Sequence, residues 1–366
     1  MIGHARWLLW EGYSEGYVKH PEQYGLMNKV LMYFFSLFKY GHEAVLFFFV
    51  LSGFVIHLKY AKNLSTSYDS KFKWTEYLYR RIKRIYPPFV FALLLTILLD
   101  SIGKQFQYTI YTGATPYKLI NDNVGQSNWD IKSLLGNLIF LYKAYVPIYG
   151  TNGPAWSLKY EWWFYMLYPL FLLAGTRKII YPSLLIIILF IASFFPGYWP
   201  EQLLPDILSM MITWWLGVIL AEVYTGRIKL NYKYLSLSVL AILLKPVLST
   251  QNAMADLCMA FFFFGLISFF LLLSKENMVI RFLERLKIMG DFSFTLYIIH
   301  FPILVFMSGW LMQRQGNWLP SHFMYVFLGI IITTIFAYVI HFITEIPFIQ
   351  VKKKLAIPVE MELQKV

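Results

Sequence analysis

Long apolar segments recur along almost the whole chain, and they constrain its fold more than any other feature. They run from Tyr40 to Ile346, and many approach the ~20 residues that a helix needs to cross a hydrocarbon core of ~30 Å. Hydrophobic residues make up 58% of the 366 positions and charged residues only 14%. A soluble domain of this composition would precipitate. The sequence therefore predicts an all-α, polytopic membrane protein.

Nine segments are predicted to cross the membrane. They are residues 42–58, 77–100, 156–175, 179–196, 206–224, 234–249, 256–274, 290–312 and 323–346. One further apolar run, Leu134 to Tyr149, is short and is closed by Pro147 and Gly150. We interpret it as a re-entrant or interfacial segment, which is allowed where protein or water satisfies its backbone. We expect a single domain over residues 1–350.

Basic residues mark alternate hinges and set the expected orientation. They gather at Lys59–Arg84, Arg177–Lys178, Arg227–Lys233, Arg281–Lys287 and Lys352–Lys354. By the positive-inside rule these hinges are cytoplasmic, so residues 351–366 form a cytoplasmic tail and the polar loop Ser101–Lys132 lies outside. This orientation places Met1 outside without a signal peptide before the first span. We therefore expect that most of a first helix precedes Met1.

Charge distribution and cysteine content argue against two classes of site. The net charge is +12, but the basic residues lie in hinges rather than on one face of a soluble module, which argues against nucleic acid as a partner. The single cysteine, Cys258, lies in an apolar run, so the sequence predicts neither a disulfide framework nor a thiolate metal cluster. We expect no metal cofactor.

His4 is the leading candidate for a catalytic residue. It lies close to Trp7 and Trp10, at the outer membrane boundary in this topology. A neutral imidazole in a partly dry setting can take a proton from an alcohol, and Glu11 could hold its other nitrogen or stabilise the imidazolium. The alternative is an interfacial histidine that only makes a hydrogen bond at the surface.

Five blocks of sequence stand in a specific order over about 300 residues. They are Phe47–Ile56, Arg80–Pro87, Ala155–Tyr165, Gly290–Pro302 and Glu345–Pro347. In this order they resemble the membrane acyltransferase 3 family. The resemblance implies an enzyme that moves an acyl group, usually acetyl from acetyl-CoA, onto sugar hydroxyls in polysaccharides, lipopolysaccharide, peptidoglycan, antibiotics or nodulation signals.

The resemblance also implies a role for His4. The essential histidine of the family closes the first transmembrane helix, and an arginine or lysine precedes it in that helix. His4 matches this histidine by its Gly-His context and by its distance from the block that contains Ser52 and Gly53. The basic partner would lie before Met1, which agrees with the expectation that helix one begins upstream.

Four basic residues at the cytoplasmic mouth of a span are candidates for binding the phosphates of coenzyme A. They are Arg80, Arg81, Lys83 and Arg84. Guanidinium groups can clamp phosphates through two parallel hydrogen bonds. The alternative is that the cluster only sets topology and binds anionic lipid headgroups.

Glu161 and His300 lie within predicted spans and are further catalytic candidates, because ionisable groups in a bilayer are costly and usually functional. The alternative for His300 is a histidine that satisfies a neighbouring carbonyl. Ser52 and Gly53 are interpreted instead as a close helix contact, since small residues let backbones approach.

We therefore expect a membrane-bound O-acyltransferase in the inner membrane of a bacterium. It would take an acyl group from acetyl-CoA or another acyl-CoA on the cytoplasmic side and acylate a hydroxyl of a cell-envelope glycan or exported glycoconjugate. The expected partners are acyl-CoA, a carbohydrate acceptor and the lipid bilayer. The main alternative is a transporter or flippase that uses Glu161 and His300 as a proton relay, although the sequence has no internal repeat. A weaker alternative is a non-catalytic homologue.

Overall fold

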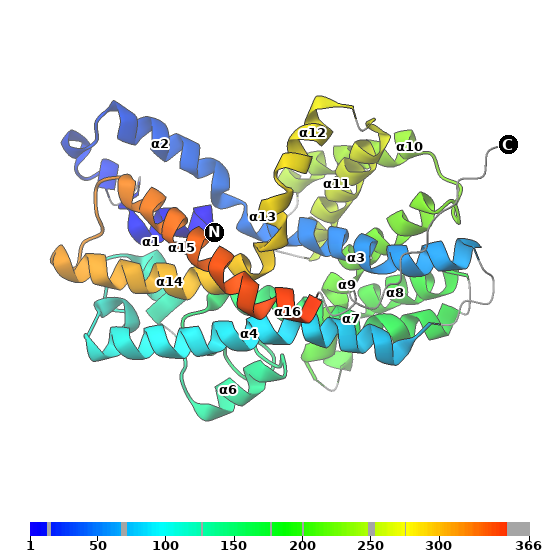
Figure 1. The fold of residues 1–366 in the computed structure, drawn as a ribbon, viewed down its shortest axis with the longest axis horizontal. Helices are drawn as coiled ribbons and strands as arrows, with labels where there is room; N and C mark the ends of the chain where they lie inside the picture. Colours follow the sequence, from blue (N-terminus) through cyan, green and yellow to red (C-terminus); the bar gives the residue numbers. More distant parts are fainter. Residues whose placement is uncertain are drawn as a thin grey trace.

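The computed structural model describes residues 1–12, 16–66, 72–125, 127–175, 178–199, 201–247, 253–274 and 276–349. Across these ranges the chain forms helices, turns and loops, and the only β-type pairings are two isolated bridges, Asn128 with Tyr149 and Tyr142 with Val146. The all-α prediction is confirmed. Figure 1 shows α3, α4 and α14 running roughly along the long axis of the molecule, whereas α11 and α15 are tilted against it.

Six described helices are long and apolar enough to cross a membrane. They are α3 (Gly41–Thr66), α4 (Trp74–Gln105), α9 (Leu203–Tyr224), α11 (Ala253–Leu272), α14 (Ser293–Arg314) and α15 (Met324–Thr344), which α16 (Ile346–Ile349) continues. Each coincides with a predicted span. Large apolar side chains such as Ile331, Ile335 and Ile343 on α15 remain exposed, as expected for a helix that faces lipid. The polytopic prediction is confirmed.

Two of the remaining predicted spans form shorter or more polar helices. α7 (Trp156–Gly175) has 20 residues, but its first half carries Lys159 and Glu161. α8 (Ile180–Ala192) has only 13 residues. These two helices therefore match the predicted positions but are not regular apolar spans.

The segment predicted at 234–249 winds differently from the other spans. α10 (Tyr232–Ser236) is followed by a 3₁₀ helix over Leu237–Val247. A 3₁₀ helix rises about 2 Å per residue against about 1.5 Å for an α-helix, so the two together rise by about 30 Å. Tighter winding thus gives this short segment the length of an ordinary span.

The predicted re-entrant segment contains a short helix followed by a folded loop. α6 (Ile131–Leu138) has eight residues and is therefore too short to cross a bilayer. The Asn137 side chain then donates to the Pro147 carbonyl at 2.9 Å and accepts from the Tyr149 amide at 3.1 Å. Phe140 stacks on Phe89. The loop thus packs on the protein, which helps to satisfy its backbone polar groups.

The other helices are short. They are α1 (Ile2–Leu9), α2 (Leu26–Ser36), α5 (Lys118–Ile120), α12 (Met278–Arg285) and α13 (Lys287–Asp291), with single helical turns at Pro21–Gln23, Leu37–Lys39, Thr109–Tyr111, Asn121–Gly125, Gly153–Ala155 and Pro196–Tyr198. α1 packs against α14 and α15, with the N-terminus inside the outline of the bundle in Figure 1. Its buried Leu8 and Leu9 share a core with Leu304 and Val326. This packing holds α1 in place beside the middle of α14.

α3 and α9 touch backbone to backbone. A Cβ atom at Gly53 would lie 2.0 Å from the Trp214 carbonyl oxygen, and one at Gly217 would lie 1.9 Å from the Val50 carbonyl oxygen. Only glycine fits at such a distance, which confirms that Ser52 and Gly53 mark a close helix contact. The predicted tail, residues 351–366, lies outside the described residues.

Candidate active site

His4 and His300 form a direct pair between α1 and α14. Nδ1 of His4 lies 2.9 Å from Nε2 of His300, and the two ring planes are within 8° of each other. His300 is buried, whereas His4 is half-buried. The sequence marks both residues as candidates, but the tertiary structure joins them in one site.

The backbone of α14 determines which nitrogen of each ring carries a proton when both rings are neutral. Nδ1 of His300 lies 2.6 Å from the carbonyl oxygen of Tyr297 and 3.1 Å from that of Leu296. Because carbonyl oxygens only accept, this nitrogen must donate, and Nε2 of His300 is then an acceptor. Nδ1 of His4 must therefore donate to it. The arrangement leaves Nε2 of His4 unprotonated and able to take a proton.

A proline near His300 removes one backbone hydrogen bond from α14. Pro302 has no amide hydrogen, so the carbonyl of Ile298, four residues earlier, loses its usual helical donor. The side-chain amide of Asn152 donates to this carbonyl at 2.8 Å. Asn152 is buried, and its Oδ1 atom has no partner among the described residues. Asn152 thus braces the turn of α14 that carries His300.

Aromatic side chains surround the His4 ring. Phe301 lies edge-on to it with ring centroids 5.1 Å apart, and Trp7 lies edge-on at 6.0 Å. Such rings exclude water and lower the local dielectric, which strengthens the hydrogen bond between the two histidines.

Tyr297 connects the histidine pair to the start of α7. Its hydroxyl donates to the Pro154 carbonyl at 2.6 Å and lies 2.5 Å from Oγ of Ser157. Two further polar residues follow Ser157 at one-turn intervals on α7. These are Glu161 and Tyr165, and the Tyr165 hydroxyl donates to the Glu161 carboxylate. The polar line from Ser157 to Tyr165 extends about 12 Å by helix rise.

The basic cluster of α4 meets the far end of this line. The guanidinium of Arg81 lies between the rings of Tyr77 and Tyr165, at 5.5 and 5.4 Å from their centroids. Its Nε atom is buried and has no hydrogen-bond partner within the described ranges. A buried donor without a partner costs free energy unless a ligand or water satisfies it. Arg81 is therefore the member of the cluster best placed to hold an anion.

The other three basic residues lie in different surroundings. Arg80 pairs with Glu76 through an N–O distance of 2.5 Å. The ammonium of Lys83 lies 4.3 Å from the centroid of the Tyr79 ring, and Arg84 is exposed. The carboxylate of Glu76 offsets the charge of Arg80, so Arg80 has less capacity for a second anion than Arg81 has.

Glu11 does not hold His4 in this structure, contrary to the expectation that it would orient the base. The Nδ1 atom of His4 is occupied by His300, and the Glu11 carboxylate accepts from the Tyr117 hydroxyl at 2.9 Å. Burial raises the pKa of Tyr117 above the ordinary value for tyrosine, so this hydroxyl stays protonated and donates. The reason is geometric: α1 ends at Leu9, and Trp10 is extended, so Glu11 leaves the helix that carries His4.

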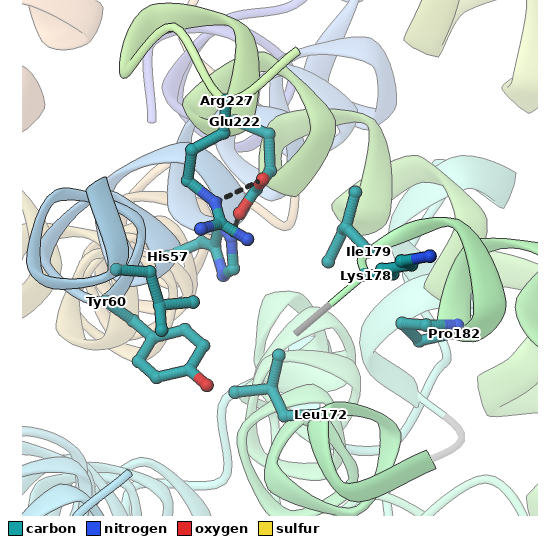
Figure 2. A pocket seen from close by; sticks show the side chains of 9 residues that line it. His57, Tyr60, Leu172, Lys178, Ile179, Pro182, Glu222 and Arg227 are labelled. Atoms are coloured by element: carbon teal, nitrogen blue, oxygen red, sulfur yellow. Dashed lines mark hydrogen bonds and ion pairs between the residues drawn. The ribbon is translucent and has the colours of Figure 1, made fainter. Parts of the chain in front are cut away.

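A second buried polar cluster joins α3 and α9, as Figure 2 shows. Nε2 of His57 lies 2.7 Å from one carboxylate oxygen of Glu222, and Nδ1 lies 2.7 Å from the Tyr168 hydroxyl. Arg227 donates to the other carboxylate oxygen of Glu222 at 2.8 Å. The cavity beside it holds about 10 Å³, roughly one water molecule. Neither His57 nor Glu222 is among the candidates predicted from the sequence, although a carboxylate inside an apolar span is a visible signal.

Within the described part of the chain, no group of three or more His, Cys, Asp or Glu side chains lies close enough to hold a metal ion. The family model described as "Acyltransferase domain" matches residues 17–342, a range that contains His300, Glu161 and the basic cluster but not His4 or Glu11. No curated protein and no solved structure matches the chain significantly.

Proposed function

The chain belongs to the membrane acyltransferase 3 family, and on that premise we propose that it transfers an acetyl or other acyl group from acyl-CoA to a sugar hydroxyl. The acceptor is a cell-envelope glycan or an exported glycoconjugate. Membership of the family supports acyl transfer in general. The donor, the acceptor and the location in a bacterial inner membrane are our proposals, argued from the site and from the charge of the hinges.

The pair of His4 and His300 is the observation that carries the proposal. The carbonyl of Tyr297 sets the tautomer of His300, and His300 sets that of His4. This leaves Nε2 of His4 as a base held by packing and hydrogen bonds, as general-base catalysis requires. His300 acts as a positioning residue, in the place that the sequence analysis gave to Glu11.

The proposed reaction is direct transfer. Nε2 of His4 takes the proton of the acceptor hydroxyl while the acceptor oxygen bonds to the carbonyl carbon of the thioester. The tetrahedral intermediate then breaks its carbon–sulfur bond. The proton on His4 passes to the departing sulfur, so the products are an O-acyl ester and free coenzyme A, and His4 is neutral again.

The donor is proposed to enter from the end of the bundle where the basic cluster lies. Arg81 holds a phosphate of coenzyme A, and its buried Nε atom has no hydrogen-bond partner among the described residues. The pantetheine arm then follows the polar line of α7 from Tyr165 to Ser157, about 12 Å by helix rise. At its end Ser157 contacts Tyr297, in the turn before His300.

The transporter alternative requires Glu161 and His300 to exchange a proton. Glu161 bonds Tyr165, whereas His300 bonds His4 and the carbonyls of its own helix. No hydrogen bond joins the two residues directly in the described structure. This lack of a direct bond favours the enzyme over the relay.

The proposal is tested with the full chain purified into lipid nanodiscs. Radiolabelled acetyl-CoA is supplied with a panel of methyl glycosides and with glycan extracted from bacterial envelopes, and both labelled product and free thiol are measured. We expect thiol release that depends on the acceptor and matches ester formation one for one. If the folded protein releases no thiol with any acceptor, the proposed function is wrong.

A further inference from the structure

A cavity of about 580 Å³ lies at the end of the bundle predicted to face outside, and Trp7, whose ring contacts that of His4, is part of its wall. This volume falls within the range typical of small-molecule sites. α1, α2, the segment around α5 and the connection between α14 and α15 form its walls. The lining residues that matter here are Arg6, Trp7, Trp10, Tyr33, Tyr117 and Lys118.

The charge of the cavity wall is positive. Arg6 and Lys118 reach it from different elements, and neither side chain has a hydrogen-bond or ion-pair partner among the described residues. The nearby acidic side chain, Glu11, does not line the cavity and already accepts from the Tyr117 hydroxyl. Two cations without partners that face one cavity favour an anionic ligand, and the planar fork of arginine suits a carboxylate or a phosphate.

The aromatic residues of the wall connect the cavity to the base. Trp7 lines the cavity, and its ring also lies 6.0 Å from the ring of His4. Indole rings provide flat apolar surfaces with a polar edge, which suits the faces of sugar rings. A sugar bound here would lie one helical turn from His4.

We propose that this cavity binds an acceptor sugar that carries a negative charge, with Arg6 and Lys118 holding the anion and Trp7 holding the ring beside His4. This inference rests on the proposed function, since it names the class of acceptor for the same site. The anion can be the carboxylate of a uronic acid or the phosphate of a sugar phosphate, because both offer oxygens to the guanidinium in the same geometry.

Direct binding is the first test. Methyl glucoside, its uronate and its 6-phosphate are titrated onto the full chain in nanodiscs without acyl-CoA, with affinity measured by microscale thermophoresis. We expect at least one charged sugar to bind tenfold or more tightly than methyl glucoside, and the tighter of the two identifies the source of the anion. Equal affinity for all three sugars would overturn the proposal.

Substitutions in the cavity wall test which residues cause the preference for the charged sugar. Arg6→Gln and, separately, Lys118→Gln should each reduce the preference for the charged sugar, by about tenfold for Arg6. Lys118 is exposed, so its variant keeps the packing of α1 and stays informative if Arg6→Gln does not fold. Lys132→Gln removes an exposed charge that does not line the cavity and should change nothing. If both variants keep the full preference for the charged sugar, the cavity is not the site that binds the acceptor.

A measurement of acyl transfer distinguishes a failure of this inference from a failure of the proposed function. If the charged sugar binds through Arg6 but no acceptor causes thiol release from acetyl-CoA, the anion site stands and the proposed function fails. If acyl transfer occurs with the same kcat/KM for charged and neutral sugars, the function stands and the inference fails.

Discussion

Nδ1 of His4 lies 2.9 Å from Nε2 of His300, and a backbone carbonyl on the far side of His300 determines which ring donates the hydrogen between them. The resulting series of hydrogen bonds runs from the Tyr297 carbonyl through His300 to His4, whose Nε2 atom stays free. In a catalytic triad a buried carboxylate orients the catalytic histidine. Here a neutral imidazole, that of His300, orients His4.

Replacing His4 with alanine should lower kcat for acyl transfer by about 100- to 10,000-fold, because the general base is lost. Labelled ester measured by mass spectrometry at matched protein levels checks this. His20→Ala is the control, since the His20 side chain is exposed and its one ion pair among the described residues is with Glu22. Activity within about threefold of the native chain would remove His4 from the mechanism.

His300→Leu should lower kcat by about 10- to 1,000-fold, because His4 then loses the acceptor that fixes its tautomer. His300→Gln should be milder, since its side-chain oxygen can accept from His4. The double variant His4→Ala with His300→Leu should be no slower than His4→Ala alone, because residues that act as a unit are non-additive. Multiplicative losses in the double variant would show that His300 acts independently of His4.

Asn152→Leu should destabilise the protein by about 1 to 3 kcal/mol, because the Ile298 carbonyl beside Pro302 is left without a donor. It should also lower kcat more than it raises the KM for acetyl-CoA, since the affected turn carries His300. Thermal unfolding in detergent and steady-state kinetics measure the two effects. Asn123→Ala, which removes an exposed local bond to Leu119, should leave both within error.

Arg81→Gln should raise the KM for acetyl-CoA tenfold or more, because the buried Nε donor of Arg81 has no partner among the described residues. Arg80→Gln should have a smaller effect, since Glu76 already pairs with Arg80. Lys59→Gln removes a charge at the same predicted side and controls for a change in topology. An unchanged KM in the Arg81 variant, with the tail still accessible from the original side, would contradict donor binding at this cluster.

The sequence by itself determined the class of this protein and most of its elements. Hydropathy placed a helix at every predicted span, because an apolar run of sufficient length in a membrane protein must satisfy its backbone within the segment. It also identified Gly53 as a close contact. It missed the 3₁₀ winding of Leu237–Val247, because 3₁₀ and α-helices bury apolar residues with similar patterns and differ mainly in their backbone hydrogen bonds.

The partners of the candidate residues were decided only by the tertiary structure. His4 and His300 are 296 positions apart, and no periodicity reveals that α1 lies beside α14. Proximity in sequence predicts Glu11 as the partner of His4, yet the end of α1 at Leu9 directs the chain away. Hydrophobicity determines which residues enter the bilayer, but lipid is equally apolar around every helix. Which helices become neighbours, and which faces they present, depends on packing and hydrogen bonds between segments far apart in the chain.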